Sequence, residues 1–223
     1  CIRDSCDRVD TLIGIFATGK KPTGVKDPYA LRRAAIALVR LSIEGECDFD
    51  LLTMLQYSAH LLQDRLATDT AAAEVFDYVM ERLRGYYSDQ NIGHDIFAAV
   101  RAVKPTRLID FNDRMQAVCS FQSLSEAASL AAANKRISYI IKKTNAQESL
   151  AVDESLFSVS AEKQLHQQIS QLEVEVAPLF ASRQYSDALT ALAQLRPSID
   201  QFFEDVMVTV SYTHLRAHET SAD

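Results

Sequence analysis

The chain has 223 residues, of which 48% are hydrophobic and 24% charged, and its formal net charge is −7. This composition is typical of a folded protein, and its acidity excludes a globally basic nucleic-acid binder but allows a local basic face. With only 6 glycines and 5 prolines, collagen-like and low-complexity classes are excluded and helices are favoured. No apolar run approaches the roughly 18 residues of a membrane-spanning helix, so we expect a cytoplasmic protein without one.

Apolar residues spaced three and four apart predict a series of helices in the first half of the chain. Asp27-Pro28 predicts a helix start, because aspartate can cap free N–H groups and proline suits the first helical position. Gly45 predicts the end of that helix. Further helices are expected over residues 51–66, 75–87 and 96–103.

The segment around Pro105 predicts a domain boundary, after which the helical spacing resumes. We expect Asp110 to cap a helix that carries Phe111 and Phe121. Ser123-Leu124-Ser125-Glu126 matches a capping box, in which the serine and glutamate side chains bind each other's backbone N–H groups. An alanine-rich helix with a basic end should follow.

The last part of the chain predicts two long helices after a loop at 144–158. One is expected over 161–180 and the other over about 185–208, where Pro197 predicts a kink or a break. No segment has a convincing strand period. The sequence therefore predicts an all-α fold.

Charge is distributed in four blocks along the chain. Residues 11–40 carry a net charge of +5 and residues 101–143 also carry +5, whereas 41–100 carry −8 and 144–210 carry −7. We call 11–40 the first basic island and 101–143 the second. They are either solvated helix faces or two separate contacts with a polyanion, and composition leaves both open.

Short catalytic and metal-binding motifs are incomplete in this sequence. The segment Gly19–Gly24 begins like a phosphate-binding loop but continues with Val25-Lys26 instead of Lys followed by Ser or Thr. His94-Asp95 lacks the further ligands of a phosphohydrolase metal site, and the spacing of the four cysteines fits no zinc or disulfide framework. We therefore expect no catalytic residue, no metal ligand and reduced thiols.

Three long segments, in fixed order over about residues 7–209, carry a resemblance to a known family. Together they strongly resemble the beta subunit of the bacterial-type heterotetrameric glycyl-tRNA synthetase. The third is similar to the helical, DALR-type anticodon-binding domain that ends that subunit. The segments are Asp7–Phe16 running on to Lys21–Ala35, then Arg107–Val118 with Ala131–Ile137, then Tyr185–Leu189 with Phe202–Val208.

The resemblance implies a domain plan for a chain that is truncated at both ends. Residues 1–44 would end an HD-like helical domain, 45–104 would form a connecting helical body, and 105–210 a DALR-like anticodon-binding helical bundle without its last helix. Residues 211–223 read like translated sequencing adapter, so we expect a non-native tail there.

The resemblance also implies a function. The chain would be a non-catalytic, tRNA-binding part that recognises glycine tRNA and its anticodon, in a heterotetramer of two alpha and two beta subunits. ATP and Mg would bind at the alpha subunit, and this part would bind no cofactor.

The charge map then suggests the basic residues that contact tRNA, although Arg114 or Arg136 could instead bridge to Asp110 or a neighbouring helix. The candidates are Lys20, Lys21, Lys26, Arg32, Arg33, Arg107, Arg114, Lys135 and Arg136.

Two other classes of function stay open at this point. A stand-alone helical adaptor or scaffold would carry the same basic islands only as solvated faces, and its attraction to RNA would simply weaken with salt. An HD-type phosphohydrolase is the third alternative, and it would require a bound metal.

Overall fold

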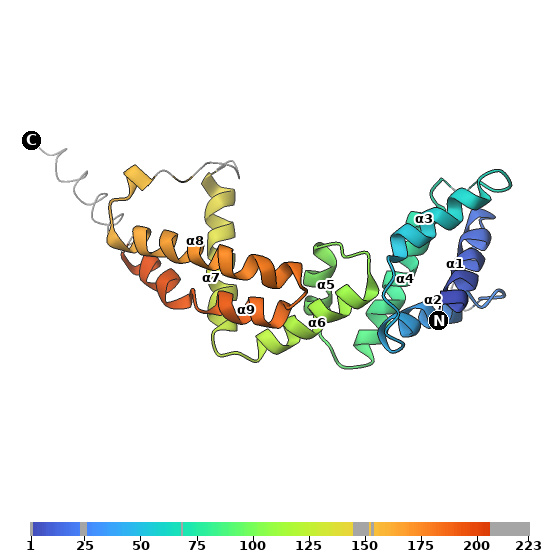
Figure 1. The fold of residues 1–223 in the computed structure, drawn as a ribbon, viewed down its shortest axis with the longest axis horizontal. Coiled ribbons are helices and arrows are strands. Elements are labelled where there is room, and N and C mark those ends of the chain that lie inside the picture. The colour runs from blue at the N-terminus through green and yellow to red at the C-terminus, as the bar shows by residue number, and fades with distance from the viewer. Residues whose placement is uncertain (1, 23–25, 68, 145–151, 153, 206–223) are drawn as a thin grey trace, which may run out of the picture. The chain divides into compact units, whose positions relative to one another are not determined.

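The computed structural model describes residues 2–22, 26–67, 69–144, 152 and 154–205 (Figure 1). These residues form helices and no strand, which confirms the all-α class, and one isolated backbone bridge joins Asp50 to Arg107. In the described ranges, no helix combines the length and apolar character that crossing a membrane requires. The chain divides into two compact units, Cys1–Cys119 and Ser120–Asp223.

The first unit is built from α1 to α5 and most of α6, all packed on one hydrophobic core. Helix α1 packs against α2, α3 and α4, and α4 also packs against α2, α3 and α5. Fully buried side chains such as Leu12, Leu38, Leu55 and Leu83 fill the centre. The helices are α1 (Ile2–Ala17), α2 (Leu31–Ile43), α3 (Leu51–Leu62), α4 (Ala71–Ser88), α5 (His94–Ala102) and α6 (Leu108–Gln122).

Asp27 caps α2 as predicted, but the helix begins later than the sequence suggested. Its carboxylate accepts hydrogen bonds from the backbone N–H of Leu31 at 2.8 Å and of Arg32 at 3.0 Å. Ala30 has a φ of 55°, in the left-handed region, so the chain turns once more before the helix starts. The predicted stop at Gly45 is confirmed: α2 ends at Ile43, and a Cβ on Gly45 would lie 2.6 Å from the Leu41 carbonyl oxygen.

Helix α6 begins at Leu108, so the prediction that Asp110 caps it is wrong. Asp110 lies inside the first turn instead. Leu108, Phe111 and Met115 are buried in the core of the first unit, which therefore contains side chains from both sides of the boundary expected at 104/105. Cys47 is disulfide-bonded, so the expectation of four reduced thiols is wrong at that residue.

The second unit has a small core between α8 (Ser160–Ala181) and α9 (Tyr185–Ala193). These two helices lie side by side and run in opposite directions (Figure 1). Leu172 and Val176 of α8 pack against Ala188 and Ala191 of α9. Helix α7 (Ala127–Thr144) and a short 3₁₀ turn, η1 (Glu154–Leu156), precede them. The long helix expected over 161–180 is confirmed by α8.

The break expected at Pro197 is also confirmed. Helix α9 ends at Ala193 and residues 196–205 are again helical, so Pro197 lies in the first turn of the new segment, where its missing N–H is not needed. The capping box expected at Ser123 is wrong: the Ser123 hydroxyl donates to the Ser120 carbonyl oxygen at 2.6 Å, and α7 begins only at Ala127. The expected tail at 211–223 lies outside the described residues.

Candidate nucleic-acid interface

Three candidates of the first basic island are engaged within the protein. Lys21 forms an ion pair with Glu74, and the ammonium nitrogen of Lys20 lies 5.8 Å from the centre of the Tyr29 ring. Arg32 is half-buried near Tyr78. Burial raises the pKa of Tyr78, against the opposing effect of nearby guanidinium groups that include Arg32. All three side chains therefore already have contacts within the protein, although those of Lys20 and Lys21 are exposed.

Lys26 and Arg33 differ from the other members of the first basic island. Both side chains are exposed, and within the described part of the chain neither has an ion-pair or hydrogen-bond partner. Their charges are therefore not neutralised locally. If this island meets a polyanion, these two residues offer the accessible positive charge.

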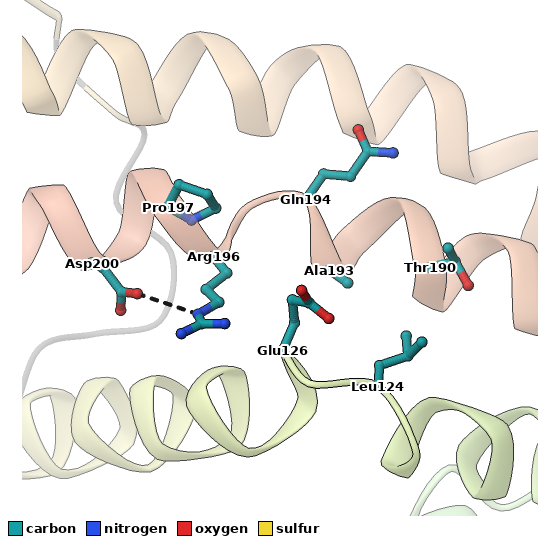
Figure 2. A pocket seen from close by; sticks show the side chains of 8 residues that line it. All are labelled: Leu124, Glu126, Thr190, Ala193, Gln194, Arg196, Pro197 and Asp200. Atoms are coloured by element: carbon teal, nitrogen blue, oxygen red, sulfur yellow. Dashed lines mark ion pairs between the residues drawn. The ribbon is translucent and has the colours of Figure 1, made fainter.

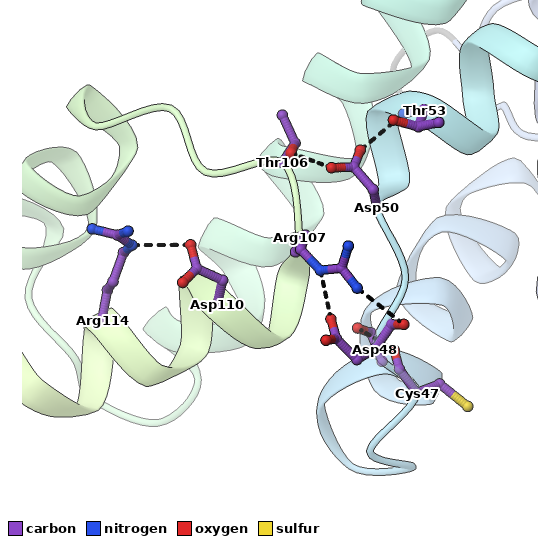
Figure 3. A network of polar contacts seen from close by, with 9 residues as sticks. Cys47, Asp48, Asp50, Thr53, Thr106, Arg107, Asp110 and Arg114 are labelled. Atoms are coloured by element: carbon purple, nitrogen blue, oxygen red, sulfur yellow. Dashed lines mark hydrogen bonds and ion pairs between the residues drawn. The ribbon is translucent and has the colours of Figure 1, made fainter. Parts of the chain in front are cut away.

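Arg107 lies in a polar network that ties the start of α6 to the start of α3 (Figure 3). Its Nε donates to a carboxylate oxygen of Asp48 at 2.9 Å, and a terminal nitrogen lies 3.4 Å from the Asp48 carbonyl oxygen. Next to it, Asp50 caps α3 by accepting from the Thr53 backbone N–H at 2.9 Å and also accepts from the Thr106 hydroxyl at 2.6 Å. This network gives Arg107 a structural role within the first unit.

The pKa of Asp50 lies below its ordinary value. Burial by itself raises this pKa, but the hydrogen bonds from Thr106 and Thr53 and the positive charge of Arg107 together outweigh burial. The carboxylate therefore stabilises the folded protein at pH above the unfolded-state value of about 3.9. That contribution is lost as the pH falls through the folded-state pKa.

We predict that Asp50→Ala lowers the free energy of unfolding by about 1–2 kcal/mol at neutral pH, because α3 loses its cap. The difference from wild type should shrink as the pH falls from about 4 through the lowered pKa of Asp50, because the folded wild-type carboxylate is then protonated. Urea unfolding at a series of pH values measures both effects. Asp50→Asn is the matched control, since its amide oxygen keeps the cap without the charge and should remove most of the pH dependence. An Asp50→Ala variant as stable as wild type at neutral pH would contradict the prediction.

Arg114 forms the ion pair that the sequence analysis left open as an alternative. Its Nε lies 3.0 Å from a carboxylate oxygen of Asp110, one helical turn away, and both side chains are mostly buried, at 25% and 13% exposure. Arg107 and Arg114 both belong to the first unit. The other two candidates of the second basic island, Lys135 and Arg136, belong to the second unit.

The basic end of α7 holds an exposed lysine and an arginine that contacts an aromatic ring. The side chain of Lys135 is exposed, and the guanidinium carbon of Arg136 lies 4.1 Å from the centre of the Phe203 ring. Tyr139 and Lys142 are exposed as well. These last two residues were not among the candidates predicted from the sequence, although their helical spacing from Lys135 was a usable signal.

A hollow in the second unit lies beside the segment that leads into α7 (Figure 2). Arg196 is its one basic lining residue, and its Nε lies 3.5 Å from a carboxylate oxygen of Asp200. Glu126 lines the same hollow, and its pKa is lowered by a hydrogen bond from Ser125 and, more weakly, by the charge of Arg196. With two carboxylates around one guanidinium, the hollow does not favour a phosphate group. It is lined by Leu124, Glu126, Thr190, Ala193, Gln194, Arg196, Pro197 and Asp200.

The incomplete motifs do not gain partners in the described structure. His94 is the first residue of α5, and no group of three or more His, Cys, Asp or Glu side chains that could hold a metal ion occurs among the described residues. Part of Gly19–Gly24 lies outside the described residues. The basic side chains are thus the main candidate functional feature.

Two family models match most of the chain. Residues 5–102 match the glycyl-tRNA synthetase beta subunit model, and residues 130–219 match the DALR anticodon binding domain model. The chain is also 44% identical over 208 residues to the glycine–tRNA ligase beta subunit of Shewanella putrefaciens, and 45% identical over 212 residues to that of Pseudomonas aeruginosa. The chain belongs to the glycyl-tRNA synthetase beta subunit family. The resemblance inferred from the three sequence segments is therefore confirmed.

Within the glycyl-tRNA synthetase beta subunit family, this chain corresponds to a part of a longer protein. The two alignments cover 93% and 95% of the chain but only 30% and 31% of the relatives. The DALR match runs to residue 219, beyond the end expected at 210. The boundaries expected at 44/45, 104/105 and 210/211 stay predictions, as do the individual tRNA-binding residues.

Proposed function

We propose that this chain is the non-catalytic, tRNA-binding part of a glycine–tRNA ligase beta subunit, and that it recognises glycine tRNA, including its anticodon. The observation that carries the proposal is the DALR anticodon binding domain match over residues 130–219. That range begins within α7, whose basic side chains can attract an RNA backbone. The family membership favours this function over the adaptor and the phosphohydrolase.

The chemistry of the reaction belongs, in this proposal, to a separate alpha subunit that binds ATP and Mg. Two alpha and two beta subunits would assemble in the cytoplasm. By holding the tRNA, the beta subunit would place the acceptor end at the active site of the alpha subunit. Positioning of this kind lowers the entropic part of the activation barrier and raises specificity for the correct tRNA.

We predict that the chain binds glycine tRNA at least about tenfold more tightly than the same tRNA with its anticodon replaced, at fixed physiological salt. Replacing the anticodon removes contacts to the edges of unpaired bases and so lowers the affinity for the altered tRNA. The contacts to phosphates are the same for both tRNAs. A binding titration with the two tRNAs measures the ratio. Repeating it at several salt concentrations gives the electrostatic contribution, which should be equal for both.

Equal affinities with equal salt dependence would contradict anticodon reading by this chain. The result would instead fit a protein whose basic faces attract any RNA. A related full-length beta subunit, titrated with the same two tRNAs, is the positive control, because it shows that the altered anticodon is discriminated under these conditions.

A further inference from the structure

One face of α7 gathers two lysines around a tyrosine. Lys135, Tyr139 and Lys142 are spaced four and three residues apart, which places them on the same side of a helix. All three are exposed, and 67% of the Tyr139 side chain is accessible, although tyrosine commonly buries its ring. The preceding turns of the same face carry only short, exposed side chains, which leave room beside the tyrosine ring. These side chains are Ala128, Ala131 and Ala132.

The other side of α7 is partly covered. Leu130 and Ala133 are half-buried there, whereas Ile137 on the same side is 39% exposed. Arg136 lies next to them along the helix surface and stacks on Phe203. Its guanidinium group therefore serves a contact within the protein. The outward face, defined here as Lys135, Tyr139 and Lys142, takes no part in that contact.

The charge of the outward face is not compensated. Between Glu126 and Glu148 the sequence contains no acidic residue, so α7 has no carboxylate of its own. Among the described residues, none of the three outward side chains has an ion-pair or hydrogen-bond partner. Lys135 and Lys142 are separated by seven residues, or about 10 Å along the helix axis, so their ammonium groups can flank the Tyr139 ring on both sides.

We propose that this face binds single-stranded RNA, with Tyr139 stacking on an unpaired base and the two lysines contacting the neighbouring phosphates. An accessible aromatic ring between cations matches the chemistry of an unpaired nucleotide, which presents a flat base and a charged backbone together. A base-paired duplex offers no free base surface for stacking. The larger exposed apolar side chains Ile137 and Ile141 lie on the other side of α7, so the neighbours of the tyrosine on its own face are alanines and lysines. The inference rests on the proposed function and deepens it by assigning a base-stacking residue.

The test uses the whole chain and an RNA hairpin whose unpaired loop carries a glycine anticodon, with a fluorescent base analogue in the loop. Tyr139→Ala should weaken binding about five- to a hundredfold, because base stacking on the ring is lost. Tyr139→Phe keeps the ring and should bind within about twofold of wild type. Stacking should also quench the analogue's fluorescence with wild type and Tyr139→Phe, but not with Tyr139→Ala.

Two further measurements separate stacking from charge and from general surface effects. Lys135→Gln and Lys142→Gln should each lower the slope of log affinity against log salt by about 1, since each removes one phosphate contact. Tyr57→Ala is the matched control: Tyr57 is 64% exposed on α3, a helix without charged residues other than its histidine, and its loss should leave RNA binding unchanged.

The outcomes distinguish this inference from the proposed function. The stacking role is overturned if Tyr139→Ala binds the hairpin as tightly as wild type. It is also overturned if Tyr139→Phe loses as much affinity as Tyr139→Ala. Both conclusions hold whether or not the wild-type chain prefers the glycine anticodon. If Tyr139→Ala loses affinity equally for every loop sequence and wild type shows no anticodon preference, the stacking role stands and anticodon reading is rejected. A wild-type chain that binds no RNA overturns both.

Discussion

Replacing Phe111 by alanine is expected to lower the free energy of unfolding of the first unit by about 3–5 kcal/mol. Phe111 lies on α6 with no exposed side-chain surface. Its ring centre is 5.1 Å from that of Phe97 on α5 and 6.1 Å from that of Tyr87 on α4. The substitution would leave a cavity where three helices meet, and rigid helices cannot close around it fully.

The same cluster includes a partly buried hydrogen bond that limits how far α6 can shift. The Tyr87 hydroxyl donates to the Asn112 side-chain oxygen at 3.0 Å, and burial raises the pKa of Tyr87 well above its ordinary value. Because Asn112 adjoins Phe111, a shift of α6 toward the cavity would strain this hydrogen bond. The hydrogen bond thus favours retaining the cavity over collapse, which places the expected cost in the upper part of the range.

Urea unfolding followed by helical circular dichroism measures the loss. Val103→Ala is the control, since Val103 is 61% exposed at the end of α5 and its truncation should change stability by less than about 0.5 kcal/mol. A Phe111→Ala variant that loses less than about 1 kcal/mol would show that α6 does not close the core of the first unit.

Reversing the charges of Lys26 and Arg33 together is expected to weaken tRNA binding about ten- to a hundredfold at physiological salt. Both side chains are exposed and lack local ion-pair partners in the described structure, so each can reach a phosphate. Because phosphates carry no sequence information, the loss should be equal for glycine tRNA and for the tRNA with a changed anticodon. The slope of log affinity against log salt should fall by about 2.

A matched double reversal controls for the change in net charge. Arg65 and Lys163 are also exposed, but they lie outside both basic islands, so Arg65→Glu with Lys163→Glu alters net charge by the same amount. That variant should lose much less affinity. Equal losses in the two double variants would show that only total charge matters, and would remove the first basic island from the interface.

Local chemistry made much of the fold predictable from the sequence. The helical spacing of apolar residues indicated α2, α3, α4, α5 and α8, because a helix buries one face and the spacing records that face. Asp27, Gly45 and Pro197 marked turns and breaks for backbone reasons that act within a few residues. Long motifs in fixed order also determined the family, since 44–45% identity over nearly the whole chain preserves them.

Partner choice among charged side chains was decided only by the tertiary structure. Arg107 pairs with Asp48 and Lys21 with Glu74, residues far apart in the sequence. Their charges looked as available as those of Lys26 or Arg33 when counted along the chain. An ion pair depends on the position of both groups in space, and composition reports only how many there are.

Helix α7 shows the same difference between what can be read from the sequence and what depends on the fold. The amino-acid sequence is enough to show that this helix is basic and lacks acidic residues over its whole length. The tertiary structure adds that Arg136, although exposed, contacts the Phe203 ring, whereas Lys135 and Tyr139 are exposed and have no ion-pair or hydrogen-bond partner among the described residues. Helical periodicity relates residues to one another, but which side is covered depends on neighbouring helices brought there by the rest of the fold.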